Sequence, residues 1–233
     1  MGKNKQARFA ENETFSLLFQ PPLEELLRGD FRLKGRWGEL MFGNAHPIVL
    51  ELGCGRGEYT VELARRTPER NFIGIDIKGA RLWRGAKTAT EEHLPNVAFV
   101  RTRVEVITSL FAAGEVSEVW LTFPDPQPSH PRRRLCSPLF LDRYAQLAPA
   151  PRGVLHLKTD SAALHAYAKA VLAASGLAPL ACTADLYAAP HDDLLDIQTT
   201  YEQMFRARGC PITYLRMPLP PGKAFTEAPD PRY

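Results

Sequence analysis

A glycine-rich segment in the first third of the chain has the residue types and spacing of a cofactor site. Glu51-Leu-Gly-Cys-Gly-Arg-Gly57 follows a short apolar run and precedes a helical pattern. Glycines at such a turn let the backbone bend sharply and let a ligand approach closely. Asp76 ends the next apolar run, where a carboxylate can accept hydrogen bonds from both hydroxyls of an adenosine ribose. These residues predict a site for an adenosine-containing cofactor.

The spacing of the glycines separates two classes of such cofactor. Dinucleotide loops place the third glycine three residues after the second, whereas Gly53, Gly55 and Gly57 alternate with other residues. Glu51 would repel a pyrophosphate, but it could hold the ammonium group of a methionine near a cationic sulfonium. The segment therefore favours S-adenosylmethionine, with an NAD-binding oxidoreductase as the alternative. Thr102, just after the third predicted strand, could bond the adenine or ribose edge.

A second chemical segment, Phe123-Pro-Asp-Pro126, ends the fourth predicted strand. Ligands of open α/β sheets bind beyond the carboxyl ends of central strands, so this loop is expected to face the glycine loop across a crevice. The two prolines restrict the backbone and hold the Asp125 carboxylate in one direction. Pro-Asp-Pro is also a good turn, but the arginines at 132–134 that follow could neutralise phosphates. We therefore expect Asp125 at the methyl donor and a nucleic acid as substrate.

Strand and helix patterns alternate from Pro47 onward. Such alternation predicts a doubly wound, mostly parallel Rossmann-like α/β sheet, here with a C-terminal antiparallel strand. The predicted strands are 48–52, 72–76, 97–100, 118–122, 154–157, 180–184 and 212–217. The predicted helices are 59–66, 80–93, 104–111, 139–147, 162–174 and 200–208.

The chain is long enough for one substantial α/β domain, which we place at residues 46–217. Residues 1–45 lack a strand signal and contain a weakly amphipathic stretch at Leu23–Leu27, so we expect a partly mobile arm with a short helix. The proline-rich tail, 218–233, is expected to be extended.

Composition limits the classes of partner. No run approaches the about 18 to 20 apolar residues of a membrane helix, and no signal peptide opens the chain, which predicts a cytoplasmic protein without a membrane partner. The four cysteines lack metal-ligand spacing, so no metal is expected. A net charge of +3 does not by itself indicate a nucleic-acid binder, but basic residues cluster locally. These clusters are Lys3, Lys5 and Arg8, and Arg28, Arg32, Lys34 and Arg36.

Five segments in order along the chain resemble the bacterial tRNA (guanine-N7-)-methyltransferase family. They are Glu51-Leu-Gly-Cys-Gly-Arg-Gly57, Gly74-Ile-Asp-Ile-Lys78, Phe123-Pro-Asp-Pro126 with its basic run, Leu157-Lys-Thr-Asp160, and Thr199-Thr-Tyr-Glu202 leading to Phe205 and Gly209. The resemblance implies S-adenosylmethionine as cofactor and tRNA as partner. It also implies methylation of N7 of a guanosine in the variable loop, typically at position 46. Separately from the resemblance, we expect a monomer or weak homodimer.

The same resemblance assigns roles to individual residues. It makes Asp125 the catalytic residue. The implied cofactor-binding residues are Glu51, Asp76, Thr102 and Asp125. To these we add Gly53 and Gly55 of the glycine loop, and Ile77 next to Asp76. The implied substrate-binding residues are Asp160, Thr199, Thr200, Tyr201 and Glu202. To these we add Arg132 and Arg133 for their charge, and Ser129 and His130 for their place in the loop.

The chain departs from the family pattern in the loop after Asp125. Gln127 stands where members usually carry Trp, and the loop is shorter, with Ser129 or His130 near the place of a substrate-binding Lys. Thr102 replaces an acidic residue that some members have. Two other functions remain alternatives: a methyltransferase for a protein or small molecule, and a catalytically silent RNA-binding module.

Overall fold

The computed structural model describes residues 2–188 and 190–228. Contacts between residues divide the chain into two compact units, which meet in sequence at Ala112 and Ala113. The cofactor residues predicted from the glycine loop lie in the first unit, and Asp125 with the predicted substrate residues lies in the second. Each unit therefore carries one half of the predicted chemistry.

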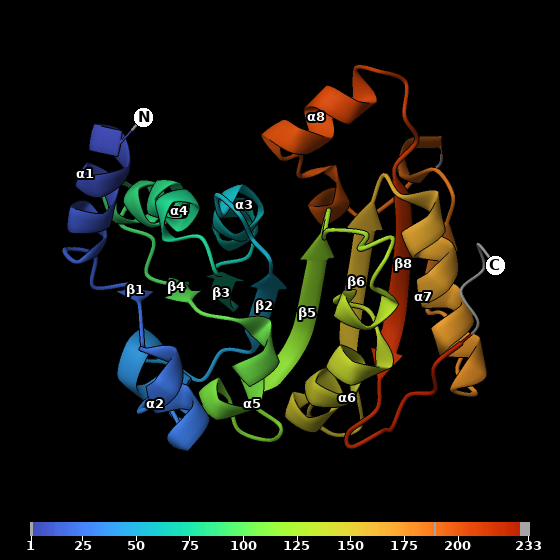
Figure 1. Ribbon diagram of the computed structural model, residues 1–233, viewed down its shortest axis with the longest axis horizontal. Coiled ribbons are helices and arrows are strands. Elements are labelled where there is room, and N and C mark those ends of the chain that lie inside the picture. The colour runs from blue at the N-terminus through green and yellow to red at the C-terminus, as the bar shows by residue number, and fades with distance from the viewer. Residues whose placement is uncertain (1, 189, 229–233) are drawn as a thin grey trace. The chain divides into compact units, whose positions relative to one another are not determined.

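The first unit is built on four parallel strands in the order β1-β4-β3-β2. The strands are β1 (Leu18–Phe19), β2 (Ile48–Leu52), β3 (Asn71–Asp76) and β4 (Val97–Arg101). Every residue of β2 and β3 is buried, as expected for parallel strands covered on both faces. The helices are α1 (Gly2–Asn12), α2 (Leu23–Arg28), α3 (Glu58–Arg66), α4 (Gly79–Glu91) and α5 (Ile107–Leu110), with short turns η1 (Gly38–Phe42) and η2 (Val104–Val106). Figure 1 shows α3 and α4 on one side of these strands and α2 and α5 on the other.

The first 45 residues contain more regular structure than the sequence pattern predicts. The expected short helix is α2, but α1 and the two-residue strand β1 were not expected. Helix α1 packs against α4: the Asn12 side-chain amide donates to the Gly79 carbonyl at 2.9 Å. The Glu11 carboxylate accepts from Trp83 Nε1 at 2.6 Å and Lys87 Nζ at 2.8 Å. These contacts fasten the described part of the N-terminal segment to α4, while its partial mobility in solution stays a prediction.

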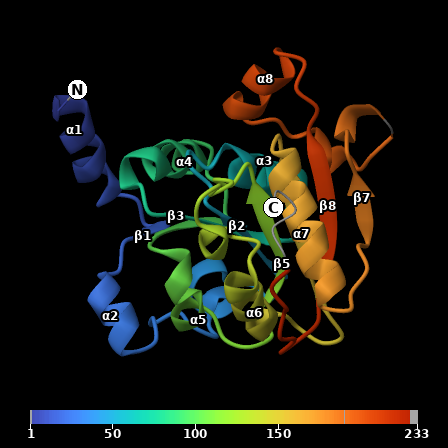
Figure 2. The ribbon, with the colours of Figure 1, turned by 45° about the vertical axis from the view of Figure 1, so that its right-hand side comes forward.

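The second unit combines parallel and antiparallel strands in the order β5-β6-β8-β7. Strands β5 (Val116–Thr122) and β6 (Gly153–Thr159) are parallel, whereas β8 (Thr213–Leu219) runs antiparallel to β6 and to β7 (Ala181–Thr183). The helices are α6 (Pro138–Leu147), α7 (Ala162–Ala174) and α8 (Thr200–Arg206), with turns η3 (Pro131–Arg133), η4 (Leu186–Ala188) and η5 (Asp193–Asp196). Figures 1 and 2 show α8 beyond the carboxyl end of β5. The expected C-terminal antiparallel strand is confirmed.

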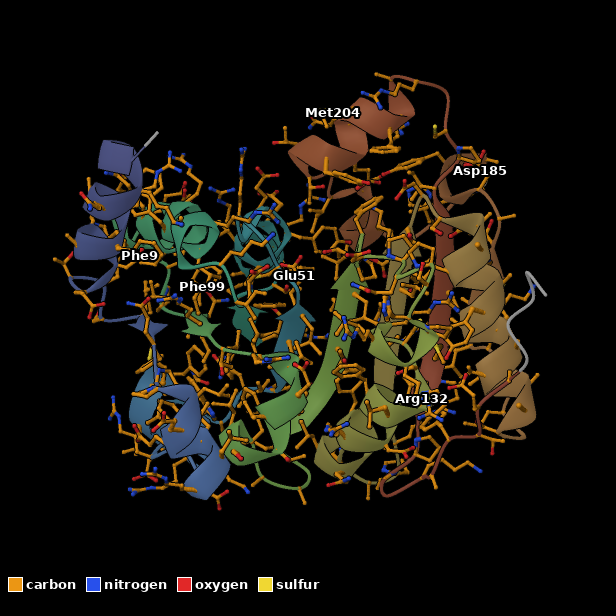
Figure 3. The ribbon with its side chains drawn as sticks, viewed as in Figure 1. Phe9, Glu51, Phe99, Arg132, Asp185 and Met204 are labelled. Carbon is orange, nitrogen blue, oxygen red and sulfur yellow. The ribbon has the colours of Figure 1, made fainter. Side chains whose placement is uncertain are left out.

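Three glycines of the first unit pack against one buried phenylalanine. A Cβ built on Gly57, Gly74 or Gly85 would lie 2.6, 2.7 or 2.7 Å from the ring of Phe99, which is fully buried on β4 (Figure 3). At Gly85, on α4, the same Cβ would also lie 2.8 Å from the Arg56 carbonyl oxygen. Since backbone atoms cannot move aside as a flexible side chain can, α4 needs a residue without a Cβ to approach the glycine loop this closely.

The replacement Gly85→Ala therefore compares two opposing effects on stability, the loss of close packing and the gain in helix propensity. Alanine favours a helix over glycine by about 1 kcal/mol, whereas overpacking costs about 1 to 3 kcal/mol. We expect a lower melting temperature and weaker binding of S-adenosylhomocysteine, because Arg56 belongs to the glycine loop. Gly29→Ala is the control, since its Cβ meets nothing within 4 Å. A Gly85→Ala protein as stable as the wild type would contradict the close-packing argument.

Candidate active site

The glycine loop has the sharply turned backbone that its sequence predicts. Gly53, Gly55 and Gly57 have φ values of 74°, 57° and 68°, in the left-handed region that glycine adopts without strain. The amides of Gly53 and Cys54 donate to the Ile75 carbonyl at 2.8 and 3.1 Å, so the loop crosses the end of β3. A Cβ on Gly55 would meet nothing within 4 Å. The space beside Gly55 fits a ligand lying against the backbone.

Asp76 joins the end of β3 to this loop. Its Oδ2 accepts from the Gly55 amide at 3.0 Å, and its Oδ1 accepts from the Lys78 amide at 2.7 Å. The side chain is mostly buried. A carboxylate has about four acceptor positions, so two backbone donors leave capacity for the hydroxyls of a ribose. Asp76 therefore lies where the sequence predicted a ribose-binding carboxylate, fixed in direction by the backbone.

Glu51 is a buried carboxylate on β2, only 3% exposed. Its Oε2 accepts from the Thr60 amide at 2.8 Å and from the Thr60 hydroxyl, both in the first turn of α3. Burial raises the pKa of the Cys54 thiol, and the charges of Glu51 and Asp76 raise that pKa further. Both carboxylates therefore act on the same loop. Their combined field favours a cationic ligand there, as an amino acid ammonium or a sulfonium would be.

Ile77 and Thr102 line one cavity of about 300 Å³ next to Asp76. The Thr102 amide donates to the Asp76 carbonyl at 3.2 Å, and the Ile77 side chain is 58% exposed. The structure thus brings these two predicted cofactor residues together. The remaining lining residues, which the sequence did not indicate, are Gln20, Pro21, Pro22, Leu23, Arg101 and Arg103. The adjacency of the cavity to the ribose carboxylate suits it to an adenine ring.

In the second unit, Asp125 is exposed and held by Gln127. Its Oδ1 accepts from the Gln127 amide at 3.1 Å and its Oδ2 from Gln127 Nε2 at 3.0 Å. Phe123 and Gln127 have φ values of 50° and 45°, a left-handed conformation that is uncommon outside glycine. The sequence predicted that prolines would orient Asp125, but did not indicate Gln127. The residue that departs from the family pattern is thus the one that bonds to the candidate catalytic carboxylate.

Aromatic rings and a carboxylate gather close to the Asp125 loop. Tyr201 is 44% exposed, its ring centroid lies 5.4 Å from that of Phe123, and it stacks on Phe205 at 4.5 Å. Partial burial raises the pKa of Tyr201, and the negative charge of Asp160 adds to this shift. We call Phe123, Tyr201 and Phe205 the aromatic platform. It places an exposed ring beside Asp160 within the second unit, as base recognition requires.

The other residues of the Thr-Thr-Tyr-Glu segment serve the start of α8. Thr199 caps the helix, because its hydroxyl accepts from the Glu202 amide at 3.2 Å, whereas Thr200 is exposed. The Glu202 carboxylate is fully buried, with Lys158 Nζ at 2.9 Å and the Tyr187 hydroxyl donating at 2.6 Å. Burial lowers the pKa of Lys158, and the charge of Glu202 opposes that shift.

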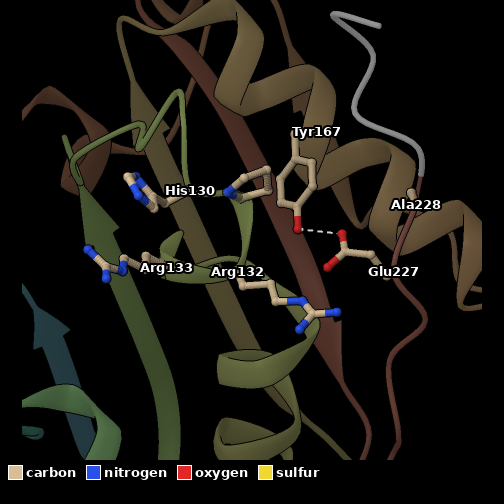
Figure 4. A pocket seen from close by; sticks show the side chains of 7 residues that line it. His130, Arg132, Arg133, Tyr167, Glu227 and Ala228 are labelled. Carbon is tan, nitrogen blue, oxygen red and sulfur yellow. Dashed lines mark hydrogen bonds between the residues drawn. The ribbon is translucent and has the colours of Figure 1, made fainter.

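The basic run after Asp125 divides into exposed and buried arginines. Ser129, His130, Arg132 and Arg133 are exposed. The last three border a cavity of about 420 Å³, where the Tyr167 hydroxyl donates to Glu227 at 2.7 Å (Figure 4).

Arg134, by contrast, is 2% exposed. Its Nε donates to the Pro126 carbonyl at 3.1 Å, and its guanidinium lies 4.2 Å from the centre of the Tyr167 ring. The expectation that all three arginines contact phosphates is wrong for Arg134, because its burial and cation-π contact hold it inside the protein, where it anchors the loop.

Residues 2–188 and 190–228 include no helix long and apolar enough to cross a membrane. In the same residues, no group of three or more His, Cys, Asp and Glu side chains is arranged to hold a metal ion.

Comparison with known proteins connects this geometry to a family. A family profile described as "Putative methyltransferase" matches residues 45–215. The tRNA (guanine-N(7)-)-methyltransferase of Christiangramia forsetii is 53% identical, over 92% of this chain and 97% of its own length. The protein of the same name from Bacteroides thetaiotaomicron is 48% identical, over 94% of this chain and 87% of its own length.

Solved structures give the fold at lower sequence identity. The 16S rRNA (adenine(1408)-N(1))-methyltransferase of Catenulisporales acidiphilia matches with a TM-score of 0.58 and 18% identity, covering 80% of this chain and 94% of that one. Together with the two units, this likeness confirms the expected Rossmann-like methyltransferase fold. The identities of the tRNA-modifying relatives are high enough, over nearly the whole chain, to settle membership: the chain belongs to the tRNA (guanine-N(7)-)-methyltransferase family.

Proposed function

We propose that this protein transfers the methyl group of S-adenosylmethionine to N7 of a guanosine in tRNA, at position 46 of the variable loop. The observation that carries the proposal is the pair of carboxylates, Glu51 and Asp76, at the two sides of a glycine loop with open space beside Gly55. Family membership adds the guanine-N7 activity and the tRNA substrate. We expect a monomer or weak homodimer acting in the cytoplasm, which light scattering and fractionation of cells would check.

The first unit would hold the cofactor from both ends. Asp76 would accept hydrogen bonds from the ribose hydroxyls, and Ile77 and Thr102 would border the adenine. Gly53 and Gly55 would let the cofactor lie close to the backbone. Glu51 balances the charge of the methionine ammonium, directly or through water. When bound, the cofactor supplies an electrophilic methyl carbon on a sulfonium, and the electron pair of the broken C–S bond stays on sulfur.

The acceptor chemistry needs no general base. Guanine N7 has a lone pair and loses no proton when it forms the new bond, but the purine gains positive charge. Alignment of the reacting atoms and a nearby anion are therefore the main requirements. Asp125, fixed by Gln127, is the proposed anion and also an acceptor for the N1 or N2 edge of the guanine. That the Asp125 loop shares one site with the glycine loop stays a prediction.

The remaining residues of the second unit bind the RNA. Tyr201 offers an exposed face on which a base can stack, and Asp160 can accept from the guanine edge. Phosphate contacts come from the exposed loop residues Ser129, His130, Arg132 and Arg133. Thr200 is exposed and precedes Tyr201 of the aromatic platform. Thr199 and Glu202, implied as substrate-binding by the family pattern, act here through the position of α8.

Nucleoside analysis tests the function directly. Unmodified tRNA transcript incubated with the protein and S-adenosylmethionine is expected to contain 7-methylguanosine, and a transcript with adenosine at position 46 is expected to contain none. If both transcripts yield 7-methylguanosine, methylation of guanine N7 is supported but position 46 is not the site. Absence of product from any tRNA, with intact binding of S-adenosylhomocysteine, would favour another acceptor or a silent RNA-binding module.

Two neighbouring residues on α8 should respond in opposite ways. Tyr201→Ala is expected to raise the KM for tRNA roughly 5- to 150-fold, since stacking of one base contributes about 1 to 3 kcal/mol. Its melting temperature should fall only slightly, because the half-exposed ring loses its contacts with Phe123 and Phe205. Glu202→Ala should lower stability by about 3 to 5 kcal/mol, because it leaves the buried Lys158 ammonium without its carboxylate. Steady-state kinetics and thermal unfolding measure both. A Glu202→Ala protein of wild-type stability with a raised KM would make Glu202 a substrate contact instead.

A further inference from the structure

Helices α1 and α4 together present a row of exposed cations in the first unit. The two helices are neighbours in both ribbon views (Figures 1 and 2), and the C-terminal half of α1 contacts α4 through Arg8, Glu11 and Asn12. Five exposed basic side chains lie on them or at the start of α4, and we call these residues the α1–α4 basic face: Lys5, Arg8, Lys78, Arg81 and Arg84. The sequence indicated the two on α1, but it gave no reason to join them to α4.

The face is held together by contacts that leave its cations available. Glu11, the acidic residue between the helices, is already bonded to Lys87 and Trp83. The Arg8 guanidinium lies 4.6 Å from the centre of the Trp83 ring, which orients it without neutralising its charge. Across the described residues, the five basic side chains form no ion pair with a carboxylate within 4.0 Å. The arginines of α3 differ, since Arg65 and Arg66 both pair with Glu62.

We propose that the α1–α4 basic face binds the phosphate backbone of the tRNA substrate, at a second place besides the loop of Arg132 and Arg133. The proposal rests on the function proposed above. Lys78, Arg81 and Arg84 lie three residues apart, so they form one stripe that spans about 9 Å along α4.

The position of the stripe relates it to the cofactor. It begins at Lys78, whose amide bonds the Asp76 carboxylate that we assign to the ribose. A tRNA that presents a guanine to the methyl donor must pass near this loop, and phosphates that continue away from it would meet Arg81 and then Arg84. The face therefore offers charge where the substrate approaches, in the unit that binds the cofactor.

The test compares two double charge reversals in the full chain. Arg81→Glu with Arg84→Glu is expected to weaken tRNA binding at least about tenfold. The slope of log affinity against log salt concentration should become shallower by about the amount that two lost phosphate contacts cause. S-adenosylhomocysteine affinity and kcat at saturating tRNA should stay at wild-type values. Arg152→Glu with Lys169→Glu reverses the same number of exposed charges on the second unit and should leave tRNA binding unchanged.

Several outcomes would overturn the inference. The first is a wild-type affinity for tRNA in the Arg81/Arg84 variant, and the second is a loss of tRNA affinity that is equally large in the control variant. The third is binding to phosphatidylserine vesicles that depends on Arg81 and Arg84 while tRNA binding does not. Failure of the proposed function is recognised separately, as absence of 7-methylguanosine from wild-type reactions. In that case, tRNA binding that depends on Arg81 and Arg84 would still support the surface.

Discussion

Asp125→Ala is expected to lower kcat for methyl transfer by at least about 10²- to 10³-fold, the loss typical of one preorganised electrostatic group. The carboxylate is exposed and, among the residues that the structure describes, its hydrogen bonds are to Gln127 of its own loop, so its removal leaves the core of the second unit untouched. The reaction creates positive charge on the purine, and alanine offers no compensating charge. Single-turnover transfer of labelled methyl to tRNA measures the effect.

Two further variants separate charge from geometry. Asp125→Asn keeps the size and one acceptor oxygen but loses the charge, so its rate should be close to that of Asp125→Ala. Gln127→Ala keeps the charge but removes the side-chain bond at 3.0 Å, so a smaller loss of about tenfold is expected from poorer orientation. All three proteins should melt like the wild type. Near-normal turnover by Asp125→Asn would show that the negative charge of Asp125 does not contribute to the rate.

The strands and helices that sequence predicted best carry their signal locally. Ile48–Leu52 is a continuous apolar run around one carboxylate, and the structure has β2 at the same residues. Ala162–Ala174 was also predicted with the observed bounds, from its helical pattern. In the structure Ser161 caps this helix through a bond from the Leu164 amide. Strand β1 has only two residues and is defined by pairing with Phe99 and Val100, far along the chain. No periodic pattern of that length could reveal it.

Site residues show the same division between local and distant causes. Glycine spacing and a strand-end carboxylate are local features, so Glu51 and Asp76 could be predicted. Arg134 looks like its two neighbours in sequence, but its burial depends on Tyr167 of α7. Glu202 likewise belongs to a motif, yet its carboxylate meets Lys158 on β6. Such partners become visible only when the fold brings distant segments together.

Asp76→Ala should be the most damaging change to cofactor binding. It removes the acceptor proposed for two ribose hydroxyls, and hydrogen bonds to a charged group contribute about 1.5 to 3 kcal/mol each. It also leaves the amides of Gly55 and Lys78 without their acceptor, so the loop that shapes the site loses a fixed point. We expect the affinity for S-adenosylhomocysteine, measured by calorimetry, to fall by about 100-fold or more.

Asp160→Ala is the matched control, because it removes a carboxylate that follows a strand of the second unit, where we propose contact with the guanine. Its affinity for S-adenosylhomocysteine should stay within about threefold of the wild type, while its KM for tRNA rises. The opposite ranking of the two variants would move the cofactor away from the glycine loop. Titration with NAD tests the dinucleotide alternative. Because the buried carboxylate of Glu51 lies beside the glycine loop, it should repel a pyrophosphate, and we expect no tight binding of NAD. Tight NAD binding by the wild type that is lost in Asp76→Ala would instead support an NAD-binding protein.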